Sequence, residues 1–211
     1  ALYPGSGTGA WEAAIVNTLS PGDRVLACVN GHFSTGFAKT AAAYGIECDR
    51  LEVPYGAGVP ADEVEARLRA DEAREVRAVL MVHNETSTGV TSNIAAVRAA
   101  MDRAGHPALL LVDTVSSLAS IDFRFDEWRV DVALTGPQKG LMLPPGMAIL
   151  AVSERALTAS EKARCPRSYW DWQPVLERNR RGEFPYTPAT VLLFGLEEAI
   201  VMLEEEGLAR V

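Results

Sequence analysis

The chain has 211 residues, of which 48% are hydrophobic and 23% are charged, so it is long enough for one large globular domain with a sizeable core. Its net charge of −8 and its lack of a basic run argue against nucleic acid as a partner. No apolar stretch reaches the length of a membrane span. The cysteines Cys28, Cys48 and Cys165 are scattered, which argues against a disulfide framework or a metal site and favours a reducing compartment, the cytoplasm.

Helical and apolar extended patterns alternate along most of the chain. Helices are expected over residues 8–19, 33–44, 61–73, 94–104 and 190–206. Strands are expected over residues 24–29, 47–53, 76–82, 108–112, 130–134 and 147–152. This alternation predicts an α/β domain, a three-layer α/β/α sandwich with a mostly parallel sheet. The last two strands flank a short Pro- and Gly-rich loop, a spacing that allows an antiparallel pair. After Ser153 the pattern loosens.

Lys139 and Asp113 form the most informative pair in the sequence. Asp113 ends the apolar run Leu109–Val112, where a parallel sheet places its ligands, although an aspartate there is also a common helix cap. Lys139 lies in a loop of small residues and turn formers, where it is either a solvated charge or an amine presented to a pocket. Together they supply what pyridoxal phosphate needs, an amine for a Schiff base and a carboxylate for the pyridinium nitrogen.

Further candidates lie upstream of this pair. Ser6, Gly7 and Thr8 run directly into a helical pattern, and the free N–H groups of a helix N-terminus hold phosphate well. Ser or Thr at this place is also ordinary capping. Thr86 follows the expected strand 76–82. An anion cradle, a hydroxyl, a carboxylate and an amine at one sheet edge fit a phosphorylated pyridine aldehyde better than a nucleotide, and the P-loop and GxGxxG fingerprints are absent.

The segments that carry these residues resemble the class V aminotransferases of fold type I, and among them the serine–glyoxylate aminotransferases. The resemblance covers essentially the whole chain. It rests on the segments Ser6–Glu12, His83–Ile94, Gly105–Asp113, Asp126–Trp128, Gln138–Pro144 and Phe184–Pro188. It implies that residues 1–211 are the large domain that binds pyridoxal 5'-phosphate. Because the first motif lies so near residue 1 and the end is abrupt, we expect an N-terminal segment and a small C-terminal domain outside this sequence.

The resemblance also implies roles for individual residues. Lys139 forms the Schiff base and moves the substrate proton, Asp113 pairs with the ring nitrogen, and Thr86 bonds the ring hydroxyl. Phe33 stacks on the ring, with plain core packing as the alternative. The phosphate is implied to lie among Ser6, Gly7, Thr8 and Gln138. A second set, from the neighbouring subunit of a homodimer, is implied to reach the same phosphate: Tyr186 and Thr187. The segment around them has no evident partner in its own domain, which supports the homodimer with its site at the interface.

The implied reaction is transamination of small amino and keto acids, from L-serine to glyoxylate, giving hydroxypyruvate and glycine. Alanine–glyoxylate and 2-aminoethylphosphonate–pyruvate aminotransferases are alternatives of the same class. A cysteine desulfurase-like lyase is a further one, against which Gln138 and Phe33 count, since those enzymes usually have histidines there. A non-catalytic cofactor-binding module is the alternative outside enzymes. The arginine that clamps the substrate carboxylate is expected beyond Val211, and His83 is expected to support the site without touching the ligand.

Overall fold

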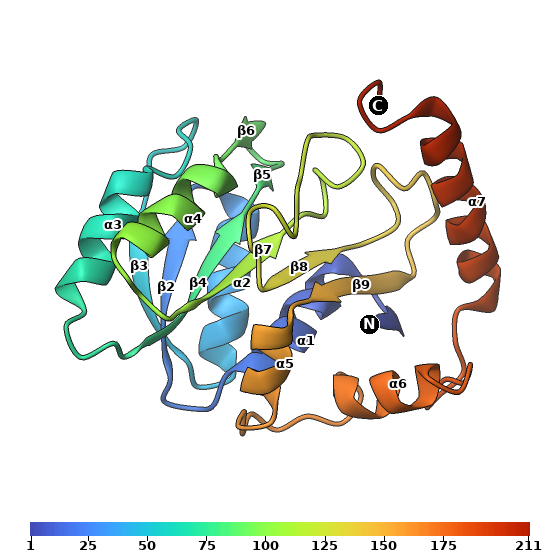
Figure 1. The fold of residues 1–211 in the computed structure, drawn as a ribbon, viewed down its shortest axis with the longest axis horizontal. Coiled ribbons are helices and arrows are strands. Elements are labelled where there is room, and N and C mark those ends of the chain that lie inside the picture. The colour runs from blue at the N-terminus through green and yellow to red at the C-terminus, as the bar shows by residue number, and fades with distance from the viewer.

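The computed structural model describes residues 1–211. One sheet has seven strands in the order β3-β2-β4-β7-β8-β9-β1 (Figure 1). Its strands are β1 (Leu2–Pro4), β2 (Arg24–Val29), β3 (Glu47–Glu52), β4 (Val76–Val82), β7 (Leu109–Asp113), β8 (Val132–Thr135) and β9 (Met147–Val152). The pairs from β3 to β8 are parallel, whereas β9 runs antiparallel to both β8 and β1. A separate hairpin joins β5 (Asn84–Glu85) to β6 (Val90–Thr91).

Helices cover both faces of the sheet, so the expected α/β sandwich is confirmed. On one face lie α1 (Gly7–Thr18) and α2 (His32–Ala43), and on the other α3 (Ala61–Ala70) and α4 (Ile94–Arg103). Neighbouring residues of a strand enter opposite cores: Leu111 packs in the cluster with α1 and α2, and Leu110 in the cluster with α3 and α4. A strand buried on both faces is therefore apolar at every position, as β7 is up to Asp113.

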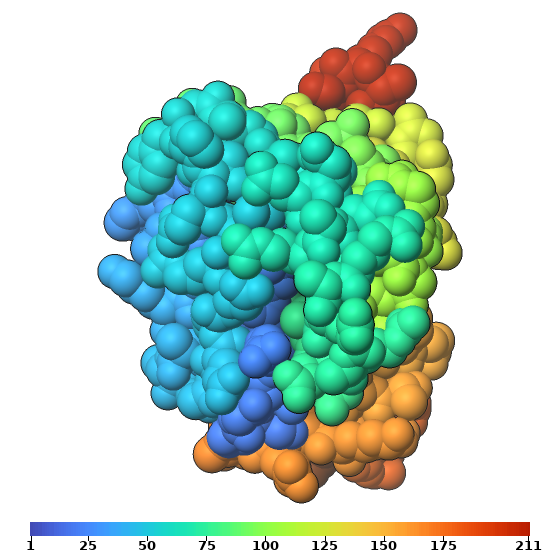
Figure 2. Space-filling view, turned by 90° about the vertical axis from the view of Figure 1, so that its left-hand side faces the viewer, coloured from blue at the N-terminus to red at the C-terminus, as the bar shows by residue number.

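The chain beyond β9 forms α5 (Glu154–Ser160), α6 (Trp172–Asn179) and α7 (Thr190–Glu206). In Figure 1, α7 stands at the edge of the molecule beside β9, and the side view of Figure 2 shows the C-terminal end of the chain projecting beyond the body of the domain. Large apolar side chains of α7 are exposed, namely Val191, Phe194, Ile200, Val201 and Met202. No helix is both long and apolar enough to cross a membrane.

Several elements differ from the sequence-based expectation. The strand β1 and the helices α5 and α6 were not predicted. The helix expected over residues 61–73 ends at Ala70, because the side chain of Asp71 accepts hydrogen bonds from the N–H groups of Glu75 and Val76. Arg74, which lies between Asp71 and Glu75, adopts a left-handed backbone with φ of 54°. A continuing α-helix does not allow this conformation.

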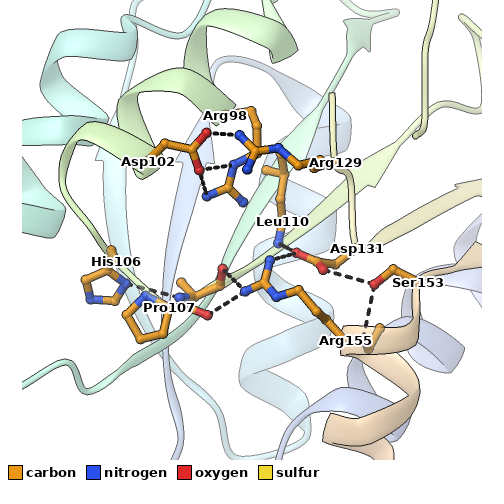
Figure 3. A network of polar contacts seen from close by, with 11 residues as sticks. Arg98, Asp102, His106, Pro107, Leu110, Arg129, Asp131, Ser153 and Arg155 are labelled. Atoms are coloured by element: carbon orange, nitrogen blue, oxygen red, sulfur yellow. Dashed lines mark hydrogen bonds and ion pairs between the residues drawn. The ribbon is translucent and has the colours of Figure 1, made fainter. Parts of the chain in front are cut away.

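A polar network connects the elements at the amino-terminal ends of the parallel strands (Figure 3). Asp131 is buried just before β8, and its carboxylate accepts hydrogen bonds from the Leu110 N–H, the Ser153 hydroxyl and the Arg155 guanidinium. Arg155 also donates to the carbonyl of Pro107. Such partners offset the cost of burying the polar carboxyl group. The network therefore joins β7, β8 and the start of α5 at the edge opposite to the candidate site.

Candidate active site

The carboxyl ends of β4, β7 and β8 meet at one edge of the sheet. In the parallel register Val82 lies beside Asp113, and Asp113 beside Leu134. Thr86 follows β4 and Lys139 follows β8. The three sequence-predicted residues Thr86, Asp113 and Lys139 therefore belong to neighbouring strand ends, where open α/β sheets bind their ligands.

Asp113 is a buried carboxylate held by two donors. The Trp11 indole N–H donates to Oδ2 over 2.6 Å and the Val115 N–H to Oδ1 over 2.8 Å. Burial raises the pKa of Asp113 to about 6, these two hydrogen bonds oppose the rise, and the nearby Glu85 adds to it. A cationic partner at this carboxylate would favour its charged form.

The first turn of α1 offers hydrogen-bond donors to an anion. Ser6 is the N-cap and its hydroxyl accepts from the Gly9 N–H over 3.2 Å. The N–H groups of Gly7 and Thr8 have no partner within the chain. A β-carbon at Gly7 would come within 2.6 Å of Val115, so glycine lets this turn pack directly beside the segment that follows Asp113. Free amides at the positive end of a helix suit a phosphate.

Glu85 connects the start of α2 with the segment after β4. Its fully buried carboxylate accepts from the N–H groups of Phe33, Ser34 and Ser87 and from the hydroxyls of Ser34 and Ser87. The backbone of Phe33 is thereby fixed beside Glu85, while the residue is 37% exposed, so plain core packing does not account for it. Glu85 was not predictable from the sequence, since an acid in a polar stretch gives no sign of burial.

The loop between β8 and β9 presents Lys139. Its side chain is exposed and makes no hydrogen bond or ion pair. The neighbouring Gly140 has no room for a side chain, because a β-carbon there would lie 2.2 Å from the Leu118 carbonyl and 2.6 Å from Ser120 Oγ. The loop thus rests on the segment that follows β7. The Gln138 Oε1 atom is buried without a partner.

The ring of Tyr186 contacts other aromatic rings of its own chain, in contrast to the expectation from the sequence. Its ring stacks on Tyr169 with centroids 4.8 Å apart, and it also lies 6.2 Å from the ring of Tyr3. The expectation that this segment lacks a partner in its own domain is therefore wrong for Tyr186, because aromatic rings after β9 and in β1 already cover it. Thr187 next to it is exposed.

Residues 3–211 match the family model described as aminotransferase class-V. The chain belongs to this family. It is 52% identical over 210 residues to an L-aspartate–glyoxylate aminotransferase of Paracoccus denitrificans, a match covering 100% of this chain and 53% of that protein. It is 51% identical over 215 residues to a serine–glyoxylate aminotransferase of Methylorubrum extorquens, covering 100% and 54%. The chain thus spans about half the length of the curated relatives it matches.

Among solved structures, the class V chain is similar to an alanine–glyoxylate aminotransferase from Nostoc sp.. The TM-score is 0.90 at 32% sequence identity, and the match covers 99% of this chain and 55% of that one. The likeness confirms the expected fold of the type I aminotransferases. The assignment of residues 1–211 as the large domain, with further segments outside this sequence, stays a prediction.

Membership of class V implies pyridoxal phosphate as the cofactor, and the residues present fit it. The free amides of Gly7 and Thr8 suit its phosphate. The buried carboxylate of Asp113 suits its ring nitrogen, and the exposed ring of Phe33 provides an aromatic face. Lys139 has an unpaired amine for its aldehyde. The side-chain amide oxygen of Gln138 is a further polar atom that is buried and has no hydrogen-bond partner within the chain.

Proposed function

We propose that the protein is a transaminase dependent on pyridoxal phosphate that moves the amino group of L-serine to glyoxylate, giving hydroxypyruvate and glycine. The convergence of Lys139, Asp113 and the amides of α1 at one sheet edge carries the proposal. Both curated relatives described above have glyoxylate in their names, which favours it as the acceptor, and the Methylorubrum relative favours serine as the donor.

Pyridoxal phosphate, when bound, supplies an aldehyde that takes up an amino group and a pyridine ring that accepts electrons from the substrate α-carbon. Lys139 Nζ would act as the general base that accepts the proton of the substrate α-carbon, and then as the acid that delivers it to the cofactor carbon. The Asp113 carboxylate holds a proton on the ring nitrogen by its negative charge. The Gly7 and Thr8 amides would bind the phosphate, Phe33 would cover the ring, and the Thr86 hydroxyl would form a hydrogen bond with the ring hydroxyl.

The test is the absorbance spectrum of the full-length protein with added cofactor, together with a Lys139→Ala variant. We expect a visible band in the wild type that L-serine bleaches and glyoxylate restores as glycine accumulates. The Lys139→Ala variant should lack this band and the turnover. A wild-type protein that acquires no band with excess cofactor overturns the proposal.

The second candidate donor is L-aspartate, because the Paracoccus relative is 52% identical and carries that name. Serine, aspartate and alanine should be compared with glyoxylate as the common acceptor, and 2-aminoethylphosphonate with pyruvate. The ratio of kcat/KM between donors decides the substrate. If the protein prefers aspartate, the proposed transaminase activity stands and L-aspartate replaces L-serine as the proposed amino donor.

We further propose a cytoplasmic homodimer with the site at the subunit interface. The exposed apolar side chains of α7, such as Val191 and Phe194, support an interface, and two-fold dimers are the commonest oligomers. Thr187 is the better candidate for a contact to the partner's phosphate, since Tyr186 is occupied within its own chain. The cytoplasmic assignment rests on the sequence alone, in which the three cysteines are scattered. Light scattering of the full-length protein measures the oligomer.

A further inference from the structure

Trp11 links the first helix to the carboxylate of Asp113. Its Nε1 donates to Oδ2 over 2.6 Å between residues separated by 102 positions in the chain. The indole is itself held rigidly: it stacks on Phe37 with centroids 5.7 Å apart and an interplanar angle of 17°. Gly36 leaves room beside it, since a β-carbon there would lie 3.0 Å from the ring. A donor fixed in this way restricts the carboxylate to one orientation.

Asp113 accepts one hydrogen bond from a side chain, the Trp11 indole, and the other from the backbone N–H of Val115. Resting on the proposed function, we infer that Trp11 is a positioning residue for the cofactor: its N–H orients the Asp113 carboxylate and keeps it charged against the pyridine nitrogen. Trp11 does not need to touch the cofactor for this role.

The electrostatics of the site explain why the donor matters. Burial raises the pKa of Asp113 to about 6, close to neutral pH, and Glu85 raises it further. Only the hydrogen bonds from Val115 and Trp11 oppose this rise. Loss of the indole N–H should therefore leave a larger fraction of Asp113 protonated near neutral pH. A neutral carboxyl is a poor partner for a pyridinium nitrogen.

The chain contains a matched control for the removal of an indole. Trp172 is fully buried, and its Nε1 has no hydrogen-bond partner. The variant Trp172→Phe removes the same atoms from a packed core as Trp11→Phe does, but it breaks no hydrogen bond. A difference between these two variants thus reports the hydrogen bond and not the lost volume.

The first experiment measures dissociation constants of the cofactor-stripped full-length protein. The probes are pyridoxal phosphate and its deaza analogue, in which carbon replaces the ring nitrogen. Trp11→Phe should weaken binding of pyridoxal phosphate about tenfold, as expected for a hydrogen bond to a charged group, and leave binding of the analogue unchanged. Trp172→Phe should affect both ligands alike. Equal losses for both ligands in Trp11→Phe, or no loss for either, would overturn the inference.

A second measurement needs no cofactor. In the NMR spectrum of the stripped protein, the indole N–H signal that disappears in Trp11→Phe is assigned to Trp11. We expect it to move as Asp113 titrates and to lose this pH dependence in Asp113→Asn. If the signal moves neither with pH nor in Asp113→Asn, the hydrogen bond is absent and the role of Trp11 is refuted. Failure of the wild type to bind pyridoxal phosphate at all refutes the proposed function instead, so the two failures are distinguishable.

Discussion

Gly7 and Val115 are in direct contact, since a β-carbon on Gly7 would lie 2.6 Å from Val115 Cγ2. The contact sets the position of the first turn of α1, which is proposed to bind the phosphate, relative to Asp113. Gly7→Ala should force the two segments apart, lower the stability by about 1–3 kcal/mol as overpacking does, and weaken the binding of pyridoxal phosphate. Urea unfolding and spectroscopic titration with the cofactor measure the two effects.

Two variants control this prediction. Gly7→Ala combined with Val115→Ala removes the clash and should restore most of the affinity. Gly58→Ala should be nearly neutral, because a β-carbon there meets nothing closer than 3.5 Å. If the double variant binds no better than Gly7→Ala, the contact does not set the turn.

Replacement of Glu85 by glutamine should destabilise the protein. One carboxylate oxygen would become an NH₂ group that faces N–H and O–H donors from Ser34 or Ser87. Burial by itself raises the pKa of Glu85, but these donors and the Phe33 N–H outweigh it, so the pKa lies below its ordinary value. We expect a loss of about 3 kcal/mol in urea unfolding, because buried donors would lose a charged acceptor.

The matched control is Glu63→Gln on the exposed face of α3, which should change stability by less than about 0.5 kcal/mol. A small effect of Glu85→Gln would mean that the start of α2 does not depend on this carboxylate. Phe33 would then need another anchor.

Much of the fold was predictable because each buried strand has a clear apolar run between helical patterns, as in β4 and β7. The elements that were missed lack such a signal. The strand β1 is short and ends in Pro4, and it exists because β9 offers it an antiparallel partner. The helix α6 buries only Trp172 and Val175, which is too few positions for a periodic pattern.

The candidate site was predictable as a set of residues, not as a set of contacts. Resemblance and strand-end positions pointed to Lys139, Asp113 and Thr86. The hydrogen bond from Trp11 joins residues far apart in sequence, and Trp11 by itself looks like an ordinary core residue of a buried helix. The buried role of Glu85 depends on donors from two segments that only the tertiary structure brings together.

The stability of the cofactor-free protein should depend on Asp113 and pH. Burial raises its pKa from 3.8 to about 6, so the folded chain keeps a proton that the unfolded chain loses in this window. Stability contributed by this group is therefore present below about pH 4 and is lost as the pH rises to about 6, by about 3 kcal/mol. Asp113→Asn should lack this decline, whereas Asp126→Asn on the exposed surface should retain it. Urea unfolding between about pH 4 and pH 7 gives the comparison.

His83 should show the opposite dependence. Its ring is buried against Phe123 and Trp128, and this desolvation lowers its pKa from 6.5 to about 4, only partly opposed by Asp122. The unfolded chain thus binds a proton before the folded chain does, so stability is lost as the pH falls from about 6.5 to about 4. NMR titration of the imidazole carbons should give the low midpoint. A midpoint near 6.5 would place the ring in water.

The pairing of β1 with β9 has a consequence for the order in which the site is made on the ribosome. The turn proposed to bind the phosphate follows β1 directly, and β1 joins the sheet only through β9. The Lys139 loop also lies between β8 and β9. A nascent chain therefore cannot hold the turn, the carboxylate and the amine together until β9 has emerged. Since domains generally fold as units during synthesis, the cofactor should meet a site that is completed late, after most of this chain has left the tunnel.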